Sequence, residues 1–435
     1  MLGKRSGRCH SARVTAPTSP LQIADYRFFW LSRFSSVVAT TGMVVVIGYQ
    51  LYEVARSDYG MGIPQAAFQL GLLGLAQFVP LLLLTPVAGI VADRFDRRRV
   101  AGLAIALDLC IALGLAITTA GGVRSLPVLF GFAALHGSAR VFVGPALSAI
   151  APNIVPAQLI PRAIAFNSIA WQAGSVVGPA AAGFLYAGAH ALPYWSGALL
   201  LAISCLCVAV IRPVPPPESN RTVHPVRQIV DGFTYVWSER FLLGCVTLDL
   251  FAVLLGGATA LMPVFARDIL HVGPEGLGQM RAAPAFGAAV VALWLSWRPL
   301  TTNVGSKMLW AVAVYGVATI AFGVSRELLF SLAVLALLGA ADMVSVFVRS
   351  SLIQLNTPDD MRGRVSAISG LAVSASNELG EMQSGVAAAL LGATGAVVFG
   401  GTGAIIITVL WAWMFPELRR ARTFAPQYRQ REPSP

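Results

Sequence analysis

Charged residues are scarce in this 435-residue sequence: Asp, Glu, Lys and Arg make up 12% of the chain, and 56% of the residues are hydrophobic. A soluble protein carries about 25% charged residues to cover its surface, so a soluble enzyme is excluded. Only 5 cysteines are present and no CxxC pair occurs. Neither a disulfide framework nor a zinc site is therefore indicated.

Several short functional motifs are also absent from the sequence. It contains no Gly-x-x-x-x-Gly-Lys-Ser/Thr phosphate loop, which argues against ATP as the energy source. It has no HExxH or GxSxG motif of an intramembrane enzyme, and no polar segment long enough for the output domain of a sensor. We therefore expect no enzyme activity, no cofactor and no metal ion.

The chain does contain twelve long apolar stretches. Each is long enough to cross a hydrocarbon core about 30 Å thick, which takes about 20 helical residues. Their richness in Gly and Ala favours closely packed helices over barrel strands. We predict an all-α integral membrane protein whose transmembrane helices cover residues 28–54, 66–92, 100–121, 126–150, 163–188, 193–211, 241–265, 277–297, 308–324, 328–355, 365–393 and 396–415.

The basic residues provide the predicted orientation. The net charge is +11, but Lys and Arg lie in short connections between the apolar stretches and not on one polar face, so nucleic-acid binding is not expected. With both termini in the cytoplasm, most of the 31 basic residues fall on the inner side, as the positive-inside rule requires. Three lie within apolar stretches, and those assigned to the outside are Arg56, Arg124, Arg267, Arg281 and Arg326.

One long polar connection divides the twelve stretches into six and six. The predicted organisation is a cytoplasmic tail (1–27), a six-helix bundle (28–211), a cytoplasmic linker with an amphipathic helix (212–240), a second six-helix bundle (241–416) and a cytoplasmic tail (417–435). The bundles resemble each other weakly, since Gly178 and Gly183 align with Gly380 and Gly385 at one constant offset. Two pseudo-symmetric six-helix bundles around a midplane site are typical of secondary transporters.

The loop after the second stretch carries a dense charge motif, Gly89-Ile90-Val91-Ala92-Asp93-Arg94-Phe95-Asp96-Arg97-Arg98-Arg99. A carboxylate followed by cations in such a short turn can hold two helices in one arrangement and release them in another. The motif resembles the signature Gly-x-x-x-Asp-Arg-x-Gly-Arg-Arg of the major facilitator superfamily, with Asp96 in the place of a glycine. Asp tolerates unusual turn geometry, so the turn itself is still expected.

The resemblance implies a gating role for this loop. Asp93 would meet the cytoplasmic start of the eleventh helix, where Arg362 and Arg364 are the nearest cations, and help to keep the inner gate shut. Gly89 would belong to the same motif, and the arginines that would brace neighbouring helix ends are Arg94, Arg97 and Arg98. The alternative is that these arginines only set the topology.

The fifth stretch reads Gly174-Ser175-Val176-Val177-Gly178-Pro179-Ala180-Ala181-Ala182-Gly183. Small residues four apart let helices approach closely, and a proline kinks a helix. The segment resembles the Gly-x-x-x-Gly-Pro-x-x-Gly-Gly motif of proton-coupled antiporters, with Ala182 in place of one glycine. Its elements are Gly174, Gly178, Pro179 and Gly183, which would imply export; a helix that only packs closely would contain the same residue types.

Charges inside the apolar stretches are costly unless they are paired or hydrated, so they mark candidate proton and substrate paths. Glu378 and Glu381 share one helix face near mid-membrane, and two carboxylates there would repel unless one binds a proton. These two are the first candidates for proton coupling. The other candidates on the path are Asp108, Arg140, Asp249, Asp342 and Asn377. A static ion pair, such as Asp342 with Arg140, is the alternative.

Further segments resemble the branch of the superfamily that includes bacterial enterobactin-type siderophore exporters: Arg140-Val141-Phe142-Val143-Gly144-Pro145-Ala146, Val155-Pro156, Asn167-Ser168 and Gly178-Pro179. This resemblance implies a monomeric multi-pass exporter in the cell inner membrane. It would move a small organic molecule, such as a drug or siderophore, by alternating access in exchange for protons. A nutrient importer driven by protons is the first alternative, and a non-transporting membrane sensor is the second. The excess of embedded carboxylates over Arg140 mildly favours cationic or neutral cargo.

Overall fold

The computed structural model describes residues 19–214, 225–359 and 361–425, and no β-strand occurs within these ranges. Six long helices form the first half of the chain, and α7 (Pro225–Ser238) connects it to the second half. The helices of the first half are α1 (Ala24–Ser57), α2 (Ile63–Arg94), α3 (Arg97–Ala120), α4 (Leu126–Ile150), α5 (Ile160–Gly188) and α6 (Leu192–Val210). Those of the second half are α8 (Arg240–Leu255), α9 (Met262–Val264), α10 (Gly273–Trp297), α11 (Val304–Val324), α12 (Leu328–Asn356), α13 (Arg362–Met414) and α14 (Pro416–Arg420).

The described residues contain 10 helices that are long and apolar enough to cross a membrane. Helix α13 is counted once among them although its 53 residues form two arms that meet at Gly392, where φ is 74°. This left-handed conformation favours glycine, and it reverses the direction of the chain between the two arms. The arms correspond to the two separate helices expected at 365–393 and 396–415. The all-α membrane fold is confirmed.

The seventh stretch is not the single helix that the sequence led us to expect over 241–265. Helix α8 ends at Leu255, and the chain continues through Gly256 and Gly257 into the short turns η4 (Ala258–Leu261), α9 and the π-helix η5 (Phe265–Ile269). Two consecutive glycines weaken a helix, and the Tyr315 hydroxyl donates a hydrogen bond to the freed carbonyl of Gly256 at 3.1 Å. Irregular backbone at membrane depth is tolerated where it lines a cavity.

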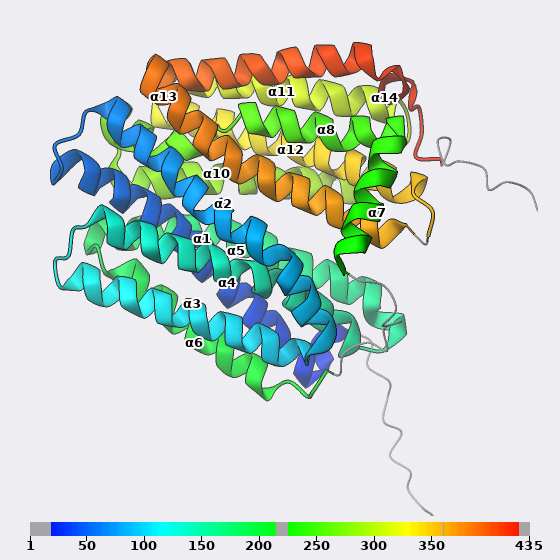
Figure 1. Ribbon diagram of the computed structural model, residues 1–435, viewed down its shortest axis with the longest axis horizontal. Helices are drawn as coiled ribbons and strands as arrows, with labels where there is room; N and C mark the ends of the chain where they lie inside the picture. Colours follow the sequence, from blue (N-terminus) through cyan, green and yellow to red (C-terminus); the bar gives the residue numbers. More distant parts are fainter. Residues whose placement is uncertain (1–18, 215–224, 360, 426–435) are drawn as a thin grey trace, which may run out of the picture.

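The two halves lie side by side in Figure 1, the first half below and the second above. Helix α2 packs against α13, and α5 packs against α10. Each contact joins the second helix of one half to the fifth helix of the other, so the two contacts are equivalent if the halves are exchanged. In both contacts the backbones meet at glycines, Gly71 with Gly385 and Gly183 with Gly278. The glycine alignment seen in the sequence therefore has a structural counterpart.

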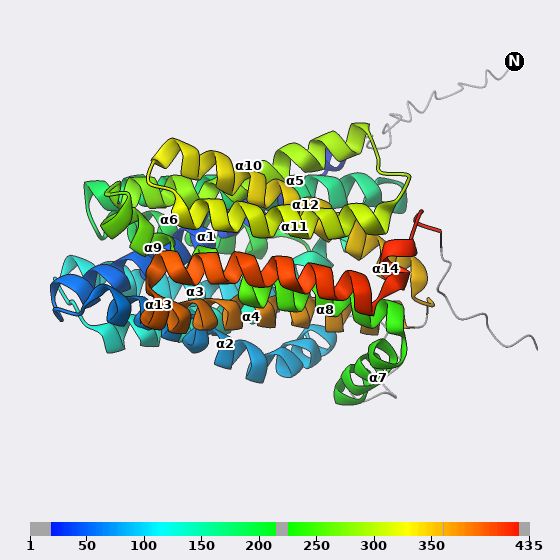
Figure 2. The same ribbon diagram turned by 90° about the horizontal axis from the view of Figure 1, so that it is seen from above.

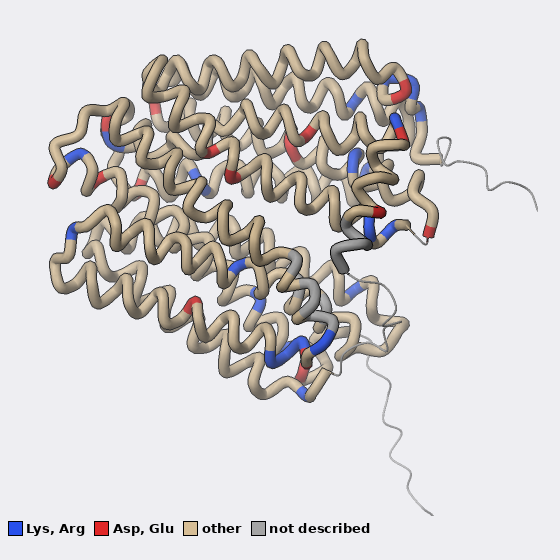
Figure 3. The backbone as a smooth tube through the Cα atoms, viewed as in Figure 1, with Lys and Arg blue, Asp and Glu red and all other residues tan. Residues whose placement is uncertain are grey.

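Helix α7, the first described turn η1 (Pro20–Gln22) and helix α14 lie at one end of the bundle, which we call the α7 end; the opposite end is the far end (Figure 1). Lys and Arg gather mainly at the α7 end in Figure 3. Figure 2 shows α7 outside the main bundle. Its residues Val230, Phe233 and Trp237 are exposed, while Asp231 pairs with Arg364 at 3.6 Å, as expected for an amphipathic connecting helix.

Candidate functional site

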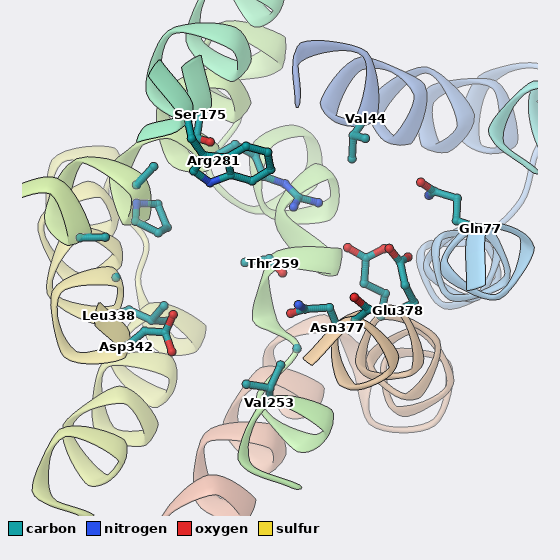
Figure 4. A pocket seen from close by; sticks show the side chains of 18 of the residues that line it. Val44, Gln77, Ser175, Val253, Thr259, Arg281, Leu338, Asp342, Asn377 and Glu378 are labelled. Atoms are coloured by element: carbon teal, nitrogen blue, oxygen red, sulfur yellow. The ribbon is translucent and has the colours of Figure 1, made fainter. Parts of the chain in front are cut away.

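A cavity of about 510 Å³ lies between the two halves. Figure 4 shows its side chains converging from both of them. Among the residues selected from the sequence as a path, five line it: Arg140, Asp342, Asn377, Glu378 and Glu381. The wall also contains Trp171 and Tyr315, and the apolar side chains Val44, Leu81, Val253 and Leu338. The wall thus combines apolar and aromatic side chains with at least as many polar and charged ones, so a small organic ligand would find both apolar contacts and charged partners there.

Four charged residues in this cavity form what we call the interdomain cluster: Arg140, Arg281, Glu378 and Glu381. Arg140 of the first half contacts Glu378 of the second half, with 3.7 Å between Nη1 and Oε1. Helix α2 approaches so closely at Gly74 that a methyl group there would lie 2.8 Å from Cβ of Glu381 and 3.0 Å from the Glu378 carbonyl oxygen. The glutamates are therefore held at the contact surface between the halves.

Arg281 is the member that the sequence reasoning missed. It was counted as a cation of an outer loop, and this was wrong: it lies within α10, lines the cavity and points into it in Figure 4. The signal was available, because residue 281 falls inside the apolar stretch 277–297. Its Nε is buried and has no hydrogen-bond partner among the described atoms. The cavity thus has two cations against three carboxylates, Asp342, Glu378 and Glu381, which weakens the argument for cationic or neutral cargo from the charge count.

The second charged group, which we call the C-half cluster, consists of Asp249, Asp342 and Arg349. Asp249 of α8 and Arg349 of α12 form an ion pair with side chains only 8% and 5% exposed. Asp342, which lies on α12 about two turns before Arg349, lines both the main cavity and a small adjoining pocket that it shares with Asp249 and Tyr315. The static pair between Asp342 and Arg140, considered from the sequence, is not formed, since Arg140 contacts Glu378 instead.

Asp108 lies away from the cavity. Its carboxylate is 2.6 Å from Nδ1 of His136 on α4, and both side chains are almost completely buried inside the first half. Nε2 of His136 is buried without a partner in the described structure. The expectation that Asp108 belongs to a cavity path is therefore not supported by its position, and the pair instead ties α3 to α4.

The charged loop between α2 and α3 is a tight helix-to-helix connection. Asp96 caps α3 by accepting a hydrogen bond from the Arg98 backbone N–H at 2.9 Å. The Arg98 guanidinium donates a hydrogen bond to the Ile211 carbonyl at 2.7 Å, at the end of α6. Arg94 ends α2 and Arg97 begins α3. Asp93 and Gly89 are not among the residues whose side chains the structure describes. Arg362, which was expected to be a nearest cation to Asp93, forms an ion pair with Asp359 at 2.6 Å.

The glycines of the fifth helix lie at helix contacts. A methyl group at Gly174 would lie 2.7 Å from Cγ1 of Val37, and one at Gly178 would lie 2.2 Å from Oγ1 of Thr41, both on α1. Gly183 faces α10, and the Pro179 carbonyl lies against Gly278. These contacts account for the small residues by packing; a role in antiport stays a prediction.

A further set of residues, not selected from the sequence, joins the halves at the far end. Asp268 of η5 accepts hydrogen bonds from the Tyr52 hydroxyl and from Arg56, the latter at 3.2 Å. Arg267 donates to the Ser57 hydroxyl at 2.7 Å and to the Glu53 carbonyl at 3.2 Å. Among the described residues, every ion pair between the halves lies either here or at Arg140–Glu378. Among the side chains that the structure describes, the far end is therefore the end joined by more polar contacts between the halves.

Two helical halves that close on a charged central cavity define the class of secondary membrane transporters. The family model for the Major Facilitator Superfamily matches residues 29–381, and the chain belongs to this superfamily. Its members carry small molecules and are generally not enzymes, and this chain is a multi-pass membrane protein of that kind.

Individual relatives and structures add detail. The enterobactin exporter EntS of Escherichia coli is 28% identical over 411 residues, covering 92% of this chain and 94% of the relative. A bacterial homolog of the human lysosomal transporter Spinster, in an inward-facing and occupied conformation, has a TM-score of 0.71 at 14% identity and covers 96% of this chain and 100% of its own. A D-xylose-proton symporter has a TM-score of 0.67 at 15% identity, covering 93% and 99%. At these identities the solved structures establish the fold alone.

Proposed function

We propose that this protein exports a small organic molecule of the siderophore or drug type across the inner membrane in exchange for protons. The observation that carries the proposal is the cavity between the halves, in which ionisable groups from both halves face one another. A volume of about 510 Å³ is within the range of about 300–1,000 Å³ typical of small-molecule sites. In this proposal the α7 end and both termini are cytoplasmic, and the functional unit is the monomer. We also propose the division into tail, bundle, linker, bundle and tail that the sequence indicates, with boundaries at residues 27, 211, 240 and 416.

Alternating access would use two sets of contacts between the halves. Those at Asp268 hold the far end closed, so the present arrangement corresponds to access from the α7 end. Opening the far end requires these contacts to break while others form at the α7 end. We assign the second role to the loop with Asp93, as its resemblance to the superfamily signature implies, with Arg98 fixing α3 to the end of α6.

Within the cavity, Glu378 and Glu381 are the proposed proton-coupling carboxylates, and Arg140 and Arg281 are their counter-charges. Asn377 lies beside them on the cavity wall. A proton bound to one glutamate would weaken its attraction to an arginine, and a bound cargo would alter the same balance. Proton and cargo would in this way affect each other's binding through one group of side chains.

Two observations support export over import. The curated relatives with 92% coverage of this chain are named enterobactin exporters, and the fifth helix resembles that of proton-coupled antiporters. Import of a nutrient together with protons is the competing function, since the fold is shared with a symporter.

The test has two parts. Cells lacking the gene are compared with the parent strain by metabolite analysis of cell extract and medium; the cargo of an exporter should accumulate inside the mutant cells and decrease in their medium. In proteoliposomes of known orientation, enterobactin serves as the probe, and a proton gradient directed from the far end to the α7 end should drive it in the opposite direction. Movement in the direction of the proton gradient would assign the protein to the importers.

A further inference from the structure

We propose that the C-half cluster of Asp249, Asp342 and Arg349 is a second proton-binding site, separate from the glutamates of the interdomain cluster. The proposal goes beyond the function above, because it adds a proton bound by residues of the second half alone. Binding of this proton does not depend on the proposed function; only its use to drive transport does.

The charges in the cavity divide into two groups. The arginines that act electrostatically on Glu378 and Glu381 are Arg140 and Arg281. The charges that act on Asp342 are those of Asp249 and Arg349. The interdomain cluster is thus balanced, with two cations and two carboxylates, and its net charge does not by itself require a proton.

The C-half cluster is not balanced. One arginine faces two carboxylates, and Asp249 already uses it in a close ion pair. Asp342 makes neither a hydrogen bond nor an ion pair within the described residues. An excess negative charge inside the membrane is strongly disfavoured, and one proton removes it.

The neighbours of Asp342 support this count. Helix α12 packs against α8, α10, α11 and α13. The charged or titratable groups that these helices bring to the two pockets are Asp249 from α8, Arg281 from α10, Tyr315 from α11, and Glu378 and Glu381 from α13, while α12 itself adds Arg349. Tyr315 already donates its hydroxyl proton to Gly256, so it does not donate that proton to Asp342.

The size of the adjoining pocket favours a proton over other cations. Its volume is about 10 Å³, and a cavity needs about 10–15 Å³ to hold one water molecule. A proton needs no space in this narrow pocket, and the Na⁺ measurement below distinguishes it from a metal cation at the same carboxylates. Because Asp342 also faces the main cavity, it can exchange this proton with the water that enters there.

The site is also connected to the moving parts of the fold. Asp249 lies on α8 and Asp342 on α12, and α8 ends at the Gly256–Gly257 break that leads to η5 and to Asp268. Protonation of Asp342 lets Arg349 interact with Asp249 alone. Release of the proton makes the two carboxylates compete for that arginine, which changes the attraction between α8 and α12.

The experiment measures proton binding without any cargo. The full-length chain in liposomes is brought from alkaline to acidic pH, protons taken up per chain are counted, and the infrared band of protonated carboxyl groups is recorded. The background is the double variant Glu378→Gln/Glu381→Gln, which lacks the first site. We expect this variant to take up one proton more than the same variant with Asp342→Asn added, and as many protons as the variant with Ser345→Ala, a neutral change in the same pocket, added instead.

Equal uptake with and without Asp342→Asn would overturn the proposal. So would suppression of the carboxyl band by Na⁺ at constant pH, because the site would then bind a metal cation. If the Asn variant does not fold, Asp342→Ser provides the same comparison, and Asp342→Glu should retain the proton. Since no cargo is present, failure of enterobactin export would test the proposed function without affecting this result.

Discussion

Arg140 on α4 and Glu378 on α13 lie 3.7 Å apart between Nη1 and Oε1, and they connect the two halves at the cavity. Arg140 is 42% exposed and Glu378 is 11% exposed, so the pair is accessible to anything that enters from the arginine side. Such a contact can be replaced by cargo or weakened by a proton without unfolding either half. It is therefore suited to link events in the cavity to the separation of the halves.

Replacing the interface carboxylates should uncouple transport from protons. In Glu378→Gln and in Glu381→Gln we expect enterobactin transport driven by a pH gradient to fall by about 10- to 100-fold, because an amide exchanges no proton and the coupling between two binding events is typically about 1–3 kcal/mol. Exchange of cargo without a gradient should decrease less. The assay is flux into proteoliposomes, with Ser374→Ala on the same wall as the control. Full coupling in both variants would exclude these glutamates.

The sequence was sufficient to predict the membrane fold and much of the cavity wall. Apolar stretches separated by basic loops are local signals, and an embedded charge is recognisable without knowing its partner. Arg140, Asp342, Asn377, Glu378 and Glu381 were found in this way and line the cavity.

What could not be predicted depends on contacts between residues far apart in the chain. Asp108 was chosen for its depth, but depth does not reveal that His136 on the next helix faces it. Arg281 was assigned to the outside although it falls within the apolar stretch 277–297, because the sequence does not show which face of a helix meets a cavity. The break at Gly256–Gly257 could not be predicted either, because the hydroxyl that satisfies the Gly256 carbonyl belongs to Tyr315, which is distant in the sequence.

The glycine contact between α5 and α10 should be intolerant of even one methyl group. In Gly183→Ala the new Cβ would lie 2.4 Å from the Pro274 carbonyl and 2.9 Å from Cα of Gly278, both backbone atoms that cannot move aside. We expect a loss of about 1–3 kcal/mol, the usual cost of overpacking. Thermal unfolding in detergent measures this loss, and Gly131→Ala, whose new methyl group meets nothing within 4 Å, should be neutral or slightly stabilising. Equal melting temperatures would contradict the close contact.

The Asp108–His136 pair should be structural. Removing one partner of this buried hydrogen-bonded pair leaves the other unsatisfied, which costs about 1–3 kcal/mol, so Asp108→Leu should lower the melting temperature. Because the pair lies away from the cavity, the ratio of protons moved to enterobactin moved should be unchanged in the molecules that remain folded. The measurement combines thermal unfolding with flux normalised to folded protein, and Ser138→Ala on α4 is the control. A changed ratio at unchanged stability would return Asp108 to the proton path.

The far-end contacts should control how often that end opens. Asp268→Asn keeps the size of the side chain but removes the charge that attracts Arg56, and the Tyr52 hydroxyl loses an ionic acceptor. The lost charged hydrogen bonds correspond to about 1.5–3 kcal/mol, which would increase the population open at the far end by about 10- to 100-fold. Spin labels at the exposed positions Tyr59 and Leu329 report the separation of the two halves at this end. The matched control is Asp58→Asn, because Asp58 pairs with Arg124 inside the first half at 3.4 Å and does not connect the halves. Unchanged distance distributions in Asp268→Asn would show that packing of α2 on α13 and of α5 on α10 is enough to hold the far end closed without these polar contacts.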